Sequence, residues 1–158
     1  MIRSLRKLRQ LPFDSLLRQQ LMLKSYLLRG GRVVNSDLSE RADVLIKDGK
    51  IESVGTVANA AAAEVIDCQG KLIIPGGIDT HTHMQLPFMG TSAKDDFNIG
   101  SKAALIGGTT SFIDFIIPDK GESLTDAYNR WKQMADGKVH SDYALHCAIT
   151  EWTSNTAA

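Results

Sequence analysis

Short apolar segments separated by tight turns fill residues 24–74. The segments form three pairs, which are 26–28 with 32–34, 43–46 with 51–54, and 65–68 with 72–74. Glycine lies between the members of each pair, and the middle pair is joined through Asp48-Gly49, a strong hairpin signal. The pattern predicts antiparallel β structure, and the alanines at 60–63 form an exposed connector between strands.

After Gly77 the pattern changes to alternating strands and helices. Apolar runs at 111–117 and 142–150 predict strands, and amphipathic spacing at 94–106 and 122–136 predicts helices. In the first helix the residues expected to face inward are Phe97, Ala103, Ala104 and Ile106. Strands that alternate with helices indicate βαβ units and a parallel sheet.

The stretch LIIPGGIDTHTH, residues 72–83, runs as an apolar strand into a glycine pair and ends on two histidines. Side chains alternate along a strand, so His81 and His83 are expected on one face and Thr82 on the other. Neutral imidazole is a common metal donor, so the pair is a candidate metal site. The alternative is that both histidines are polar residues of an exposed loop.

The residues around this pair resemble one family of enzymes. Pro75-Gly76-Gly77 with the following IDTHTH, then the stretches 84–97 and 103–124, are similar to the dihydropyrimidinase and hydantoinase branch of the amidohydrolase superfamily. The likeness covers residues 24–152. It implies an α/β fold in which 24–74 is part of a small β-sandwich domain and 75–158 is the beginning of a (β/α)8 barrel.

The resemblance also implies a chemistry. His81 and His83 would hold the more buried of two zinc ions at the C-terminal end of a strand, and metal-activated water would open a small neutral cyclic amide such as dihydrouracil or a hydantoin. The family's other ligands, a carbamylated lysine, two histidines and an aspartate, lie on later strands. A complete barrel takes roughly 250 residues, so we expect an incomplete barrel, inactive alone, with no residue assigned as catalytic.

Two neighbours of the histidines are further candidates. Dihydroorotase-like relatives usually carry an arginine where Gln85 stands. Glutamine has no positive charge to pair with a carboxylate of the substrate, so Gln85 favours a substrate with a neutral ring. The alternative is a solvated loop residue. Asp79 could orient a ligand histidine or bind nearby backbone N–H groups.

Three other polar residues are expected to have structural and not functional roles. Asp114 interrupts an apolar run and is expected to be a buried carboxylate with its hydrogen bonds satisfied. His146 is expected to be a packed strand residue, and His140 to be solvated.

Other functions are also compatible with the sequence. One is a non-catalytic scaffold like the collapsin response mediator proteins, although these typically lack the metal histidines. Another is a regulatory fragment that docks onto full-length homologues, which in this family form homotetramers. An allantoinase-like activity is the nearest enzymatic alternative.

Composition limits the kinds of binding partner and the cellular compartment that are expected. The 158 residues carry 18 basic and 18 acidic side chains, so the net charge is zero and does not favour binding to nucleic acid or to a membrane surface. The two cysteines show no metal or disulfide spacing, which fits the cytoplasm. Residues 1–23 are basic and leucine-rich, which is typical of a mitochondrial presequence. The alternatives are a disordered leader, or a true start of translation at Met22.

Overall fold

A computed structural model describes residues 24–60, 63–88 and 90–152 of the chain. These residues form two compact units that divide between Pro75 and Gly76. The interpretations of the basic leader, of the start site and of part of the alanine connector lie outside the described residues. None of the helices in the described ranges is both long and apolar enough to cross a membrane.

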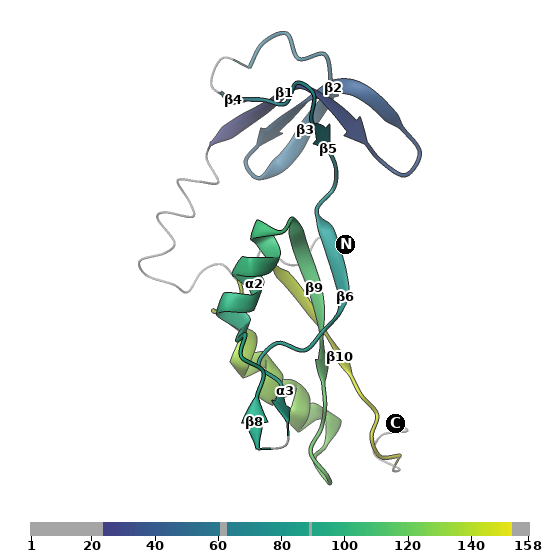
Figure 1. The fold of residues 1–158 in the computed structure, drawn as a ribbon, viewed down its shortest axis with the longest axis vertical. Helices are drawn as coiled ribbons and strands as arrows, with labels where there is room; N and C mark the ends of the chain where they lie inside the picture. The colour runs from purple at the N-terminus through teal and green to yellow at the C-terminus, as the bar shows by residue number, and fades with distance from the viewer. Residues whose placement is uncertain (1–23, 61–62, 89, 153–158) are drawn as a thin grey trace. The chain divides into compact units, whose positions relative to one another are not determined.

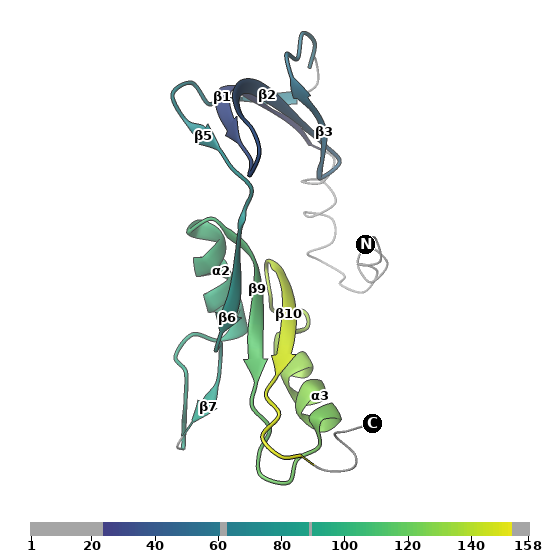
Figure 2. The same cartoon turned by 90° about the vertical axis from the view of Figure 1, so that its right-hand side faces the viewer.

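The first unit is a five-stranded sheet (Figures 1 and 2). Its strands are β1 Ser25–Val34, β2 Ser39–Lys47, β3 Lys50–Gly55, β4 Ala63–Asp67 and β5 Leu72–Ile73. As expected, β1, β2 and β3 pair antiparallel. Asp48 and Gly49 both have positive φ, at 50° and 70°, as a tight hairpin turn of this hand requires. A small core of Val33, Ala42 and Val44 lies on one face.

Two predictions for this unit were wrong. Segments 26–28 and 32–34 are one strand with an irregularity between Leu28 and Gly31, and β4 and β5 both pair parallel to β1, not with each other. At this irregularity β5 approaches β1 closely, because a Cβ at Gly31 would lie 2.6 Å from Cδ1 of Ile73. A glycine pair therefore marks a bulge within one strand here and not a turn between two.

The second unit is a parallel sheet covered on one face by two helices (Figures 1 and 2). Its elements are β6 Gly77–Thr82, α2 Phe97–Ile106, β9 Thr109–Ile116, α3 Leu124–Ala135 and β10 Asp142–Cys147. The strand order β10-β9-β6 follows the chain, and consecutive strands with helices on one side are the winding of a β/α barrel.

The strand predicted over 72–83 is divided between the units. β5 ends at Ile73 and β6 begins at Gly77, so the Pro75-Gly76 step separates them. A Cβ at Gly76 would lie 2.1 Å from Oγ1 of Thr110, so this glycine is required by a close approach of the chain. A short hairpin of β7 Pro87–Phe88 and β8 Thr91–Ser92 follows β6 and was not predicted.

The core of the second unit lies between the sheet and the helices. It consists of Phe97, Phe112, Ile116, Ala127, Trp131 and Ala135. The prediction for the inner face of α2 was wrong in part, because Ala103 is exposed and Ile106 is 90% exposed. Phe97 is buried as predicted, and Gly100 and Ser101, which were not predicted, are buried beside it at the spacing of one helical stripe.

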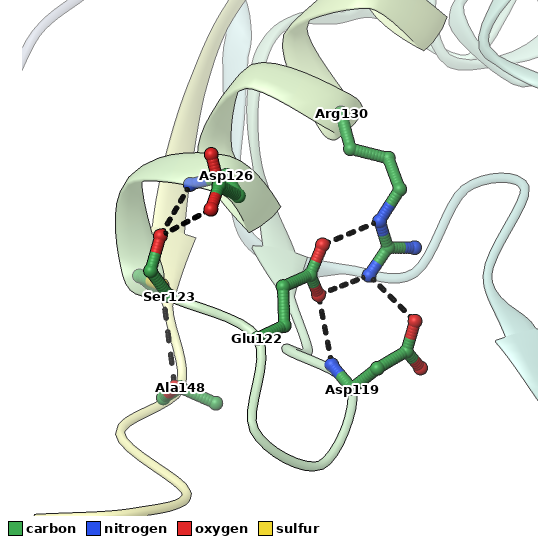
Figure 3. Close-up of polar contacts among 7 residues, drawn as sticks. Asp119, Glu122, Ser123, Asp126, Arg130 and Ala148 are labelled. Atoms are coloured by element: carbon green, nitrogen blue, oxygen red, sulfur yellow. Dashed lines mark hydrogen bonds and ion pairs between the residues drawn. The ribbon is translucent and has the colours of Figure 1, made fainter.

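Helix α3 begins at a capped and braced turn (Figure 3). Ser123 is the N-cap, and its hydroxyl accepts a hydrogen bond from the backbone N–H of Asp126 at 3.1 Å. In the loop before it, Glu122 accepts two hydrogen bonds from Arg130, at 2.9 and 2.5 Å, and a third from the backbone N–H of Asp119 at 2.8 Å. This brace fixes the loop that leaves the C-terminal end of β9.

Candidate metal centre

The histidine pair lies at the C-terminal end of β6, and its rings converge. Nε2 of His81 is 3.1 Å from Nε2 of His83, and the ring centroids are 4.9 Å apart. Both rings contact Phe115 on the face of the sheet opposite the helices, whereas the Thr82 hydroxyl points to the helix side. Strand alternation therefore predicted the orientation of all three side chains correctly.

A buried carboxylate holds the backbone of the pair from the helix side. Asp114 of β9 accepts hydrogen bonds from the Thr82 hydroxyl at 2.7 Å and the Met84 backbone N–H at 2.8 Å, both through Oδ1. Its Oδ2 accepts from the Trp131 indole N–H at 3.2 Å. Burial raises the pKa of Asp114, and these hydrogen bonds offset part of the rise. The prediction of a satisfied core carboxylate is confirmed.

On the face of the sheet opposite the helices, called the open face below, an aromatic ring contacts both imidazoles. Phe115 stacks on His81 with centroids 4.3 Å apart and planes inclined by 30°, and it lies 5.9 Å from His83. His146 of β10 approaches the same ring at 5.3 Å. His146 is exposed, so the prediction of a packed residue was wrong, because this face of the sheet carries no covering layer among the described residues. His140 is exposed as expected, although its Nε2 lies 3.0 Å from Oδ1 of Asn98.

The pairing of β6 with β9 is irregular beside the pair. Asp79 lies opposite Phe112 and Thr82 lies opposite Asp114, so three steps along β6 match two along β9. Asp79 uses Oδ1 to accept the backbone N–H of His81 at 3.1 Å. Of the two roles predicted for Asp79, the contact observed is the one with the backbone, and it fixes the main chain inside the irregular segment.

Gln85 turns the chain after the pair. Its φ of 55° is in the left-handed region, and its backbone N–H donates to the carbonyl of Asp95 at 2.8 Å. Its side-chain Oε1 is buried and has no hydrogen-bond partner among the described residues. Gln85 is thus partly buried, and its contact with a substrate stays a prediction.

The two imidazoles fit two coordination positions of one metal ion. Nitrogens bound to one ion at about 2.0–2.1 Å in tetrahedral geometry lie about 3.3 Å apart, close to the 3.1 Å observed. Within residues 24–60, 63–88 and 90–152, no group of three or more His, Cys, Asp or Glu side chains is placed to hold a metal ion. The described residues thus supply two donors.

Comparison with known proteins assigns the family. The Amidohydrolase family profile matches residues 72–151, which begin at β5 and include the histidine pair. The chain belongs to the amidohydrolase family. Membership implies a metal cofactor, and it confirms the family predicted from the residues around His81 and His83.

Within the family, the curated relatives are dihydropyrimidinases and their kin. The chain is 53% identical to rat dihydropyrimidinase over 132 residues, which are 80% of this chain and 25% of the rat protein. It is 50% identical to the dihydropyrimidinase of Dictyostelium discoideum, covering 83% and 26%. Human dihydropyrimidinase-related protein 5 is also 50% identical, covering 84% and 24%. The chain thus spans about a quarter of each relative's length.

Solved amidohydrolase structures agree with the fold. A D-hydantoinase matches with a TM-score of 0.79 and 44% identity, over 83% of this chain and 28% of that one. The dihydropyrimidinase from Brevibacillus agri matches with a TM-score of 0.78 and 43% identity, over 82% and 28%. The predicted α/β fold with part of an amidohydrolase barrel is confirmed.

Several residues of this amidohydrolase site were missed by sequence reasoning. Thr82, Met84, Phe115 and Trp131 surround the histidine pair or its anchor, yet none was a candidate. The signals in the sequence that could have indicated these contacts were the hydroxyl of Thr82 between the histidines and the carboxylate of Asp114 within an apolar run. Both became interpretable once the pairing of β6 with β9 was known.

Proposed function

We propose that this chain carries the first metal-binding pair of a cyclic amidohydrolase that opens dihydropyrimidine or hydantoin rings by hydrolysis. The observation that supports it is the convergence of the His81 and His83 nitrogens, 3.1 Å apart, at the end of a barrel-type strand. Relatives that bear the names dihydropyrimidinase and D-hydantoinase support the reaction class.

In this proposal, His81 and His83 bind zinc through Nε2. Zinc is favoured because imidazole is among its preferred donors. A bound ion supplies Lewis-acid polarisation of the amide carbonyl and lowers the pKa of water. Asp79 and Asp114 hold the main chain on either side of the rings, so the nitrogens stay aimed at one point.

Two protein donors leave about half of a four-coordinate zinc shell to be completed. We therefore propose that the 158-residue chain binds zinc weakly and has no turnover by itself. Its substrate in an assembled site is a neutral ring, because Gln85 provides no positive charge beside the pair. A full-length homologue is the proposed partner, and co-purification with one tests it.

The decisive experiment grafts this segment into a complete enzyme. Residues 24–152 replace the matching segment of rat dihydropyrimidinase, and dihydrouracil hydrolysis and zinc content are measured. We expect an active chimera that loses both zinc and activity on His81→Ala, while His140→Ala, an exposed histidine away from the pair, changes neither. A folded, zinc-loaded chimera without activity would contradict the proposal.

A second candidate is a non-catalytic scaffold. The 50% identity to dihydropyrimidinase-related protein 5 supports it, since the dihydropyrimidinase matches are scarcely higher. The histidine pair favours the hydrolase, because the scaffold relatives typically lack it. The same chimera discriminates: a scaffold segment would support assembly and leave zinc uptake and turnover absent.

A further inference from the structure

Strand β9 contacts the histidine pair from both faces of the sheet. Asp114 and Phe115 are neighbours in sequence, so their side chains point in opposite directions. Asp114 points to the helix layer and binds the backbone that carries the histidines, whereas Phe115 points to the open face and contacts the rings themselves.

The contacts of Asp114 fall on both sides of one ligand. Thr82 precedes His83 and donates its hydroxyl, and Met84 follows it and donates its backbone N–H, both to Oδ1. The carboxylate is fully buried. Hydrogen bonds to a buried carboxylate are strong, so the main chain at His83 is fixed in position relative to β9.

The contact of Phe115 fixes the other ligand at its ring. An exposed histidine ordinarily samples several rotamers, and His81 is exposed. The stack on Phe115, with centroids 4.3 Å apart, favours the rotamer in which Nε2 of His81 lies 3.1 Å from Nε2 of His83. The ring thus restricts His81 before any ion arrives.

Resting on the function proposed above, we infer that Asp114 and Phe115 are positioning residues of the metal centre: Asp114 holds the main chain at His83 through Thr82 and Met84, and Phe115 holds the His81 ring. Neither touches the ion. Outer partners of this kind orient metal ligands, and their loss costs about 10- to 100-fold in affinity.

The first test measures zinc affinity of the full chain by calorimetric titration. Phe115→Leu removes the stacking ring, and Phe112→Leu is the matched control, since Phe112 lies on the same strand but packs between Phe97 and Tyr143 on the helix side. We expect Phe115→Leu to weaken zinc binding about 10-fold or more with little loss of stability. Phe112→Leu lowers the melting temperature and leaves the affinity unchanged.

The Asp114 side of the inference is tested through Thr82, because Asp114→Ala would leave three donors without an acceptor and risks unfolding. Thr82→Val removes the hydroxyl at nearly constant shape, and Thr82→Ser keeps it. We expect Thr82→Val to weaken zinc binding about 10-fold and Thr82→Ser to restore it. Equal affinities for both variants would overturn this half of the inference.

A metal-free measurement checks the ring contact independently. The stacked Phe115 ring shifts the imidazole proton resonances of His81 in the NMR spectrum of the zinc-free chain. We expect that shift to disappear in Phe115→Leu and to persist in Phe112→Leu. An unchanged His81 shift in Phe115→Leu would overturn the positioning role of Phe115.

The two proposals fail in distinguishable ways. If the wild type and the His81→Ala/His83→Ala double variant bind zinc equally, the proposed function fails, and the NMR shift still decides whether Phe115 holds the ring. If the wild type binds zinc through the pair but Phe115→Leu and Thr82→Val bind it as tightly, the inference fails and the proposed function stands.

Discussion

Replacing Glu122 by glutamine tests the brace that fixes the loop after β9. Glu122 accepts two hydrogen bonds from Arg130 and one from the backbone of Asp119 (Figure 3). Its side chain is only 17% exposed, against 33% for that of Arg130. Hydrogen bonds to charged groups contribute about 1.5–3 kcal/mol, and exposed ion pairs about 0.2–1 kcal/mol. Because the pair is partly exposed and glutamine keeps one acceptor, we expect a loss of about 1–2 kcal/mol near pH 7.

The loss depends on pH with a definite sign. Hydrogen bonds from Arg130 lower the pKa of Glu122 below its ordinary value of 4.5. A lowered pKa in the folded state stabilises the protein above the unfolded-state pKa, and the contribution disappears as the pH falls through the folded-state value. The difference between wild type and Glu122→Gln is therefore full at neutral pH and shrinks below pH 4.5.

Urea unfolding followed by circular dichroism at several pH values measures this difference. The control is Glu52→Gln, whose carboxylate lies 3.8 Å from Lys47 with both side chains at least half exposed, so its effect stays below about 0.5 kcal/mol. The reasoning is refuted if Glu122→Gln is as stable as the wild type at neutral pH, or if its deficit persists unchanged in acid.

Three further outcomes are expected. Gly31→Ala should destabilise the chain by about 1–3 kcal/mol in urea unfolding, because its Cβ would lie 2.6 Å from Ile73, while Gly107→Ala, with φ of −78° and its nearest contact at 3.4 Å, should be tolerated. Arg41→Glu should raise stability by about 0.2–1 kcal/mol, since Arg41 faces Arg32 across β1 and β2; no change would argue against their repulsion. EDTA should leave the melting temperature unchanged, because both described cores consist of apolar side chains; a large drop would show that the fold depends on metal.

Sequence pattern located the parts of the fold that depend on local signals. The apolar run of β9, the amphipathic spacing of α3 and the Asp48-Gly49 turn each fall close to the predicted positions. That His81 and His83 share one face, opposite to Thr82, followed from strand alternation. These predictions hold because periodicity and turn chemistry are properties of a few neighbouring residues.

Features set by contacts distant in sequence were not predicted. The parallel pairing of β4 with β1 depends on how the chain crosses between strands, and the inner face of α2 depends on what packs against it. The role of Phe115 required knowing that β9 lies beside β6. An aromatic residue in an apolar run carries no sign of its partner, so pattern could not assign that contact.

The extra residue of β6 reverses the alternation of its side chains between Asp79 and His81. In an uninterrupted register that continued from Asp79 and Phe112, His81 would stand opposite Asp114 and point into the helix layer. Loss of Thr80 would remove the extra residue and still leave Thr82 opposite Asp114, so both imidazoles would stay on the face that carries Phe115. A slip of one position in the pairing, with the sequence intact, would instead turn both rings toward the helices, so the presence of the two histidines does not by itself guarantee a metal site.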